Sequence, residues 1–219
     1  MFSFSKEFRL TLFSFLFVAA VIMSNVIGGK ISFVDLFGFE IVFSVGLIPF
    51  FFTFFLLDSI NEVYGRNKTR EIIWASAFAL FFVFLVMLVS SALPFAERSW
   101  VKEGAFNSVF STSIRMVVAS LFAFILADLN DALVFSKLKE MAKGKFLWLR
   151  VNISNFVGQT LDTFVFMFLA FWNFFGFFSG YDAFFVVALA LPYLSLKLVL
   201  SLVNTPFVYV GVKWLKGEW

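Results

Sequence analysis

The feature that most constrains this chain is a long apolar stretch, residues 150 to 174, that carries a carboxylate near its middle. A helix of about 20 residues crosses the roughly 30 Å hydrocarbon core of a bilayer, and this stretch is longer than that. Asp162 therefore lies well inside the membrane, whichever end of the stretch is fixed at the membrane surface. An ionised carboxylate at that depth costs roughly 2.5–3.5 kcal/mol on insertion scales, so Asp162 requires a partner, a proton or a ligand.

Helical periodicity places Asp162 on a polar stripe. Residues three, four and seven apart share one face of a helix, and this spacing aligns Asn155, Gln159 and Asp162. The last apolar segment has a second stripe that includes Lys197 and Asn204. We expect Asp162 and Lys197 to form an ion pair between consecutive helices, either as part of a binding pocket or as a salt bridge that only fixes packing.

The composition identifies an all-α integral membrane protein. Hydrophobic residues make up 62% of the chain, charged residues 14%, and the mean hydropathy is +0.97, whereas soluble domains carry about 25% charged residues. The sequence contains no cysteine and no histidine, which excludes disulfides, thiol chemistry and histidine metal ligands. The net charge of +3 comes from loops, so no nucleic-acid-binding face is expected.

Apolar run lengths predict one domain, residues 1–219, with six transmembrane helices. The loop between the third and fourth spans is expected to hold a short amphipathic piece at the membrane interface. The predicted spans cover about residues 10–28, 41–58, 72–93, 113–131, 151–174 and 184–212.

The basic residues predict the orientation of these spans. Three of the 17 basic residues, Lys30, Arg98 and Lys102, fall in loops on one side, and two, Arg115 and Lys197, fall within spans. The other twelve share the opposite side, which is therefore cytoplasmic and holds both termini. These twelve are Lys6, Arg9, Arg66, Lys68, Arg70, Lys137, Lys139, Lys143, Lys145, Arg150, Lys213 and Lys216.

Four further charged residues are candidates for gating or coupling. Asp58 and Glu62 are four residues apart at the end of the second span, and Arg115 and Asp128 lie within the fourth. Taken alone, the first two are more typical of a solvated helix end at the lipid headgroups. Intramembrane charges more often mark a transport pathway or a site.

Enzyme functions find little support. The HExxH, GxSxG and phosphate-loop patterns are absent, and no cofactor or metal site is indicated. Asp128 and Asp162 could form an aspartyl dyad, but basic partners explain both residues more simply. We therefore expect a protein that is not an enzyme.

The polar stripes instead favour a pocket for a small flat solute. Asp162 offers two hydrogen-bond acceptors and Gln159 both a donor and an acceptor, which suits the edge of a purine-like base with adjacent N–H groups and a carbonyl. Aromatic side chains would stack on its faces. This pocket would form between the fifth and sixth helices, closed by the first, second and fourth.

Several motifs, in order along nearly the whole chain, resemble the queuosine precursor transporters, also called the vitamin uptake transporter group. They are SNVIGGK (24–30), DSINEVYG (58–65) followed by Arg70, R-x3-AS-x7-D-x2-D-x3-F (115–135), W-x-R with GQ-x2-DT (148–163), and K-x7-TP-x2-Y (197–209). The resemblance implies a six-helix inner-membrane importer of 7-deazaguanine bases (cyano- or aminomethyl-substituted, or queuine), with a fold like the substrate-binding subunits of energy-coupling-factor vitamin importers. The matching polar positions are Asn25, Asp58, Glu62, Arg115, Asp128, Gln159, Asp162, Lys197 and Asn204.

Three hypotheses follow. The leading one is a secondary transporter in which Asn25, Gln159, Asp162, Lys197 and Asn204 bind substrate. The second is a substrate-capture subunit that needs an ATP-driven coupling module, and the third is a structural membrane protein without a ligand. Partners are accordingly a small-molecule base and the bilayer, with a homo-oligomer or a coupling module left open.

Overall fold

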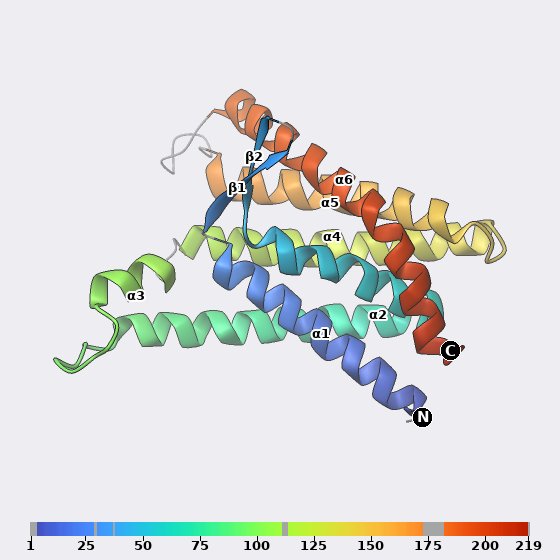
Figure 1. Cartoon of the computed structure of the whole chain (residues 1–219), viewed down its shortest axis with the longest axis horizontal. Coiled ribbons are helices and arrows are strands. Elements are labelled where there is room, and N and C mark those ends of the chain that lie inside the picture. The colour runs from blue at the N-terminus through green and yellow to red at the C-terminus, as the bar shows by residue number, and fades with distance from the viewer. Residues whose placement is uncertain (1–3, 29, 37, 111–113, 173–181, 219) are drawn as a thin grey trace.

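The computed structural model describes residues 4–218 apart from residues 29, 37, 111–113 and 173–181 (Figure 1). The described part is largely helical, with one small β-hairpin. Its elements are α1 (Lys6–Ile27), β1 (Ile31–Leu36), β2 (Phe39–Ser44), α2 (Leu47–Ala92), α3 (Glu103–Phe110), α4 (Ile114–Met141), α5 (Leu147–Phe171) and α6 (Ala183–Lys216).

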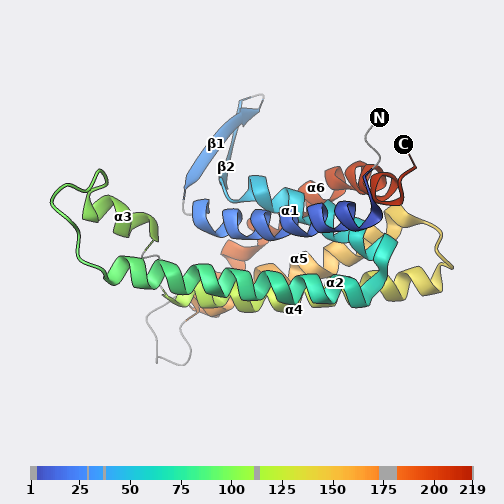
Figure 2. The ribbon, with the colours of Figure 1, turned by 90° about the horizontal axis from the view of Figure 1, so that it is seen from below.

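The helix α2 consists of two segments joined at Gly65. This residue has φ 79° and ψ 173°, a conformation outside the helical region that is accessible almost only to glycine. The chain turns back there, so that the two segments of α2 run in opposite directions (Figures 1 and 2). The two segments cover most of the second and third predicted spans.

Within the residues that the structure describes, four helices are long and apolar enough to cross a membrane: α1, α2, α4 from Ala119 to Met141, and α6. Large apolar side chains also cover the outer surface, among them Phe15, Phe78 and Phe82, each at least 65% exposed. Such a surface suits lipid rather than water. The chain is therefore a multi-pass membrane protein built from α-helices, as its composition predicts.

The hairpin corrects one prediction. The second span was expected to begin at residue 41, but residues 39–44 form β2, which pairs with β1 in an antiparallel register, and the helix begins only at Leu47. The turn contains Gly38 at φ +85°, whose backbone N–H donates to Asp35 Oδ1 at 2.8 Å. The apolar run is continuous in the sequence because both a strand and a membrane helix favour these residues.

The other helix bounds differ from the predicted spans mainly by extension. The first predicted span becomes Lys6–Ile27, the fourth continues ten residues further to Met141, and the sixth extends to Lys216 through both Pro192 and Pro206. The fifth runs from Leu147 to Phe171, and the predicted positions 173 and 174 lie outside the described residues. A short helix, α3, occupies the loop where a short amphipathic piece was predicted.

The helices pack side by side along one direction. Buried apolar side chains from α1, α2, α4 and α6, including Phe17, Ile60 and Ile73, form the main core. Both described ends of the chain lie at the same end of the molecule as the turn at Gly65 and the α4–α5 loop, whereas the hairpin and α3 lie towards the other end (Figures 1 and 2).

Candidate functional site

A cavity of about 470 Å³ lies beside the base of the hairpin, lined by residues of every helix from α1 to α6. This volume falls in the range of about 300–1,000 Å³ that is typical of small-molecule sites. Most of its lining is apolar, with side chains such as Leu47, Phe50, Phe84 and Met167. The polar and charged lining side chains are Ser24, Asn25, Ser44, Ser120, Asp162, Tyr193 and Lys197.

The predicted ion pair is present in the cavity wall. Lys197 Nζ of α6 donates to Asp162 Oδ2 of α5, and the two side chains are only 5% and 15% exposed. The ammonium also lies over two aromatic rings, 4.7 Å from the centroid of Phe50 and 5.0 Å from that of Tyr193. Each charge is thus compensated inside the protein, while Asp162 still lines the cavity.

Asn25 also lines the cavity, where it contacts a residue that the sequence analysis did not select. Ser120 Oγ of α4 donates to Asn25 Oδ1 at 2.6 Å, and Asn25 Nδ2 donates to the Val21 carbonyl at 2.9 Å. These bonds fix the orientation of the Asn25 amide. A serine in an apolar helix is a weak signal on its own, because its hydroxyl often bonds to its own helix backbone.

Two glycines close the cavity next to the hairpin. A Cβ on Gly46 would lie 2.5 Å from the Ser24 carbonyl oxygen and 2.9 Å from Gly28 Cα. Any larger residue would separate the end of α1 from the start of α2. The Gly28 of the SNVIGGK motif therefore has a packing role.

Gln159 and Asn204 do not line the cavity but lie buried between the helices. Gln159 Oε1 and both polar atoms of Asn204 have no hydrogen-bond partner in the described part of the chain, nor does Thr163 Oγ1. Unsatisfied buried polar atoms are rare in folded proteins and each requires an explanation. On α5, Gln159 is three residues before Asp162, about one helical turn away. Of the residues with these unsatisfied polar atoms, Gln159 is therefore adjacent to a residue that lines the cavity.

Asp58 lies deeper in the protein than its sequence position suggests. It is 1% exposed, and its Oδ2 accepts a hydrogen bond from Asn155 Nδ2 at 3.0 Å. The interpretation of Asp58 and Glu62 as a solvated helix end is therefore wrong. Another buried carboxylate, Asp131 of α4, was not selected from the sequence; it packs against Gly158, where an added Cβ would lie 3.0 Å from Asp131 Cβ.

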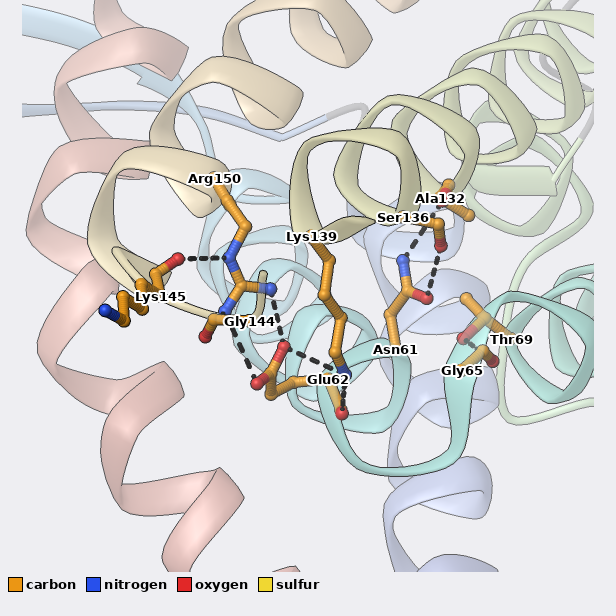
Figure 3. Close-up of polar contacts among 10 residues, drawn as sticks. All are labelled: Asn61, Glu62, Gly65, Thr69, Ala132, Ser136, Lys139, Gly144, Lys145 and Arg150. Atoms are coloured by element: carbon orange, nitrogen blue, oxygen red, sulfur yellow. Dashed lines mark hydrogen bonds and ion pairs between the residues drawn. The ribbon is translucent and has the colours of Figure 1, made fainter. Parts of the chain in front are cut away.

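Glu62 belongs to a partly buried charge cluster at the end of the molecule that holds the Gly65 turn (Figure 3). Arg150 Nη1 donates to Glu62 Oε2 at 2.7 Å and Nη2 to Oε1 at 3.4 Å, while Lys139 Nζ lies 3.3 Å from Oε2. Arg150 also donates to the carbonyls of Lys145 at 3.0 Å and Gly144 at 3.1 Å. The Arg150 side chain is 2% exposed, so this two-point contact is shielded from water.

A neutral contact lies beside this cluster and joins two of its helices, α2 and α4. Asn61 Nδ2 donates to the Ala132 carbonyl and Ser136 Oγ donates to Asn61 Oδ1, both at 3.2 Å (Figure 3). The amide thus uses both its donor and its acceptor across the α2–α4 interface. These bonds and the Lys139 contact hold α4 against the turn in α2.

The remaining two candidates are not placed. Arg115 and Asp128 belong to α4, but the structure does not describe their side chains. Arg150, by contrast, enters the sequence analysis only as one of the twelve basic residues that predict the orientation. The W-x-R motif was the only signal that distinguished it.

The chain is similar to known transporters. The profile of the family described as "Putative vitamin uptake transporter" matches residues 44–211, well over half of the chain. The "Probable queuosine precursor transporter" of Bacillus subtilis (strain 168) is 27% identical over 187 residues, which cover 84% of this chain and 77% of the relative.

Two further relatives match over a shorter segment. The "Queuosine precursor transporter" of Escherichia coli (strain K12) is 30% identical over 128 residues, 58% of this chain and 55% of the relative. The "Probable queuosine precursor transporter" of Haemophilus influenzae (strain ATCC 51907 / DSM 11121 / KW20 / Rd) is 27% identical over 128 residues, 58% of this chain and 52% of that protein. Both matches thus span about half of the relative. All three relatives have names of transporters rather than enzymes, which agrees with the missing catalytic motifs. No solved structure matches the chain.

Proposed function

Because this chain belongs to the vitamin uptake transporter family, we propose that it imports 7-deazaguanine precursors of queuosine across the inner membrane. The observation that carries the proposal is the ligand-sized cavity with the Asp162–Lys197 pair in an otherwise apolar wall. The names of the three relatives give the substrate class. Asp162 and Lys197 would bind the polar edge of the base, and Asn25 would contact its far side.

The whole chain would form one domain with six crossings: α1, the two segments of α2, α4, α5 and α6. α5 is not among the four helices that are long and apolar enough for a crossing, and it carries the polar stripe, but its 25 residues extend about 37 Å, enough for one crossing. The buried positions of Asn155 and Gln159 support this, since a bundle interior accepts polar groups that lipid rejects. The excess of basic residues at the end with both termini favours cytoplasmic termini. As the resemblance to the queuosine precursor transporters implies, the proposed fold would be like that of the substrate-binding subunits of energy-coupling-factor importers.

The route inward would follow the buried polar residues. In the described part of the chain, Gln159 Oε1 and both polar atoms of the Asn204 amide lack partners, and these atoms would bind the base or water once the helices separate. The cluster of Glu62, Arg150 and Lys139 would close this route in the present conformation. We assign Asp58, Glu62, Arg115 and Asp128 to gating or coupling.

The test is uptake of radiolabelled base into liposomes that contain the purified protein. Wild type is expected to accumulate the base, and Asp162→Asn to abolish uptake while still inserting into the membrane. Asp182→Asn is the matched control: it is the same substitution at the exposed N-cap of α6, where asparagine also caps a helix, so uptake should persist.

The outcomes separate the hypotheses. Full uptake by Asp162→Asn would remove this carboxylate from the site. Binding of the base without uptake by the purified protein would favour a capture subunit that needs a coupling module. Neither binding nor uptake of any base would favour a structural role.

A further inference from the structure

We propose that Asp58 and Asp131 together bind one proton, and that release of this proton into the cytoplasm is coupled to import of the base. The inference rests on the proposed function, because it concerns the same transport cycle. It adds the coupled ion and a second carboxyl group, that of Asp131, to the role in coupling that is assigned to Asp58.

The two carboxyl groups meet where α2, α4 and α5 pack together. Asp58 of α2 is 1% exposed and Asp131 of α4 is 7% exposed. The Asp131 carboxyl is in hydrogen-bond contact with the side chains of Asp58 and Ser154. Asp58 Oδ2 accepts from Asn155 Nδ2 at 3.0 Å. An added Cβ at Gly158 would lie 3.0 Å from Asp131 Cβ, so this glycine allows α4 and α5 to hold the two acids together away from water.

The contact between these two buried carboxyl groups requires a proton. An ionised carboxylate can only accept hydrogen bonds, so a bond between two carboxyl groups needs one O–H donor. Two ionised carboxylates in contact inside a protein repel each other strongly, and such a pair retains one proton that belongs to both groups. Asp131 Oδ1 has no hydrogen-bond partner in the described part of the chain, which leaves it open to a water molecule that delivers or removes the proton.

The carboxyl pair lies between the cavity and the charge cluster of Glu62. On α5, Asn155 contacts Asp58 and lies seven residues, about 10 Å, before Asp162 of the cavity. It also lies five residues after Arg150 of the charge cluster. The carboxyl pair is therefore placed on the route that the base would follow inward.

The charged groups on either side of this pair have partners of opposite charge. Glu62, one turn further along α2, contacts Arg150 and Lys139 (Figure 3). Towards the cavity, Asp162 of α5 contacts Lys197 of α6. The helix α4 also carries Arg115 and Asp128, whose side chains the structure does not describe. A change of protonation at the carboxyl pair thus adds a negative charge between two compensated groups.

This added charge would link the proton to the movement of the base. One carboxylate oxygen of the pair takes a proton from water on the outer side when the base enters the cavity. The same O–H bond later breaks and the proton passes to water on the cytoplasmic side, while no other covalent bond changes. Both groups are then ionised, and their repulsion separates α2 from α4 and opens the route for the base.

Gradient-driven uptake into liposomes tests the proposal with purified protein and the cyano base, which is uncharged. Valinomycin with equal potassium on both sides holds the membrane potential at zero. An inside pH one unit above the outside pH is then a tenfold proton gradient. A base that enters with one proton should accumulate up to about tenfold, and a protonophore should return its concentration ratio to one. An inward sodium gradient at equal pH should leave this ratio at one.

A variant then assigns the coupling to the carboxyl pair. Asp131→Asn keeps the shape of the side chain but neither binds nor releases a proton. This variant is expected to exchange labelled for unlabelled base across the membrane but not to accumulate it, and the retained exchange shows that it is folded. Asp58→Asn should behave in the same way. Asp182→Asn, at the exposed N-cap of α6, should accumulate the base as wild type does.

The outcomes distinguish this inference from the proposed function. A base that equilibrates without response to the pH gradient, or that follows the sodium gradient, would overturn proton coupling but leave the importer proposal intact. Wild-type accumulation by Asp131→Asn, or loss of exchange in the folded variant, would overturn the assignment to the carboxyl pair. Neither uptake nor exchange by wild type would overturn the proposed function and this inference with it. The wild-type response to the gradients stands even where a variant fails to fold.

Discussion

At the scale of single residues, Arg150 shows how a membrane protein can bury a guanidinium. Its donors reach both oxygens of Glu62 and the carbonyls of Gly144 and Lys145, with 2% of the side chain exposed. We predict that Glu62→Gln lowers the free energy of unfolding by about 3–5 kcal/mol, because it leaves a buried positive charge without its carboxylate. Denaturant unfolding of the detergent-solubilised protein measures this.

The control is the same substitution in an exposed ion pair. Glu71 contacts Lys68 at 2.8 Å, but the two side chains are 65% and 45% exposed. Exposed pairs contribute about 0–1 kcal/mol, so Glu71→Gln should unfold close to wild type. Equal stability of the Glu62→Gln and Glu71→Gln variants would mean that water enters the cluster and that Glu62 does not close the route.

At the scale of elements, one glycine determines that α2 is a helical hairpin rather than a single rod. An added Cβ at Gly65 would meet no atom within 4 Å, so a substitution there acts on the backbone alone, at φ +79°. We predict that Gly65→Ala costs about 1–3 kcal/mol of stability. Thermal unfolding should show the loss as a lower melting temperature.

Gly104 provides the matched control for this prediction. It also has open space around an added Cβ, but it lies in α3 and has no positive φ. Alanine is favoured over glycine in helices by about 1 kcal/mol, so Gly104→Ala should be neutral or stabilising. A Gly65→Ala variant as stable as Gly104→Ala would show that the turn does not need its glycine.

The sequence predicts a feature correctly where a physical requirement can be met by only one arrangement of residues. The sequence predicts the Asp162–Lys197 ion pair because two opposite charges in consecutive apolar stretches must compensate each other. The hairpin is not predicted because the apolar residues of this segment, Phe39 and 41–43, suit both a strand and a helix. The sequence predicts no role for Arg150 beyond orientation, because the burial of its side chain depends on the approach of α2, which no local pattern shows.

The same limit applies to the candidate site. Helical periodicity places Gln159 and Asp162 on the same face of α5, yet of these two residues only Asp162 lines the cavity. Helical phase gives the face of a residue but not the depth at which a neighbouring helix covers it. The sequence does not single out Ser120 and Asp131, because their partners lie on α1 and α5 rather than on their own helix, α4.

At the scale of the whole molecule, the distribution of charge predicts how the bundle lies in the membrane. Both described chain ends, the turn within α2 and the α4–α5 loop lie at one end (Figure 1). These segments contain most of the basic residues of the sequence. Positive loops remain in the cytoplasm. The sequence contains no cysteine, so single cysteines can be introduced without a background signal.

We predict that Lys145→Cys and Lys216→Cys react with a membrane-impermeant maleimide only after the membrane is permeabilised, whereas Lys102→Cys reacts in intact cells. All three side chains are exposed, so the reaction reports the side of the membrane rather than burial. Val186→Cys, at a position with 0% exposure, should react only after denaturation. Labelling of Lys145→Cys in intact cells, with Lys102→Cys protected, would reverse the orientation. The Glu62 cluster would then close the external end of the route, and the cavity beside the hairpin would face the cytoplasm.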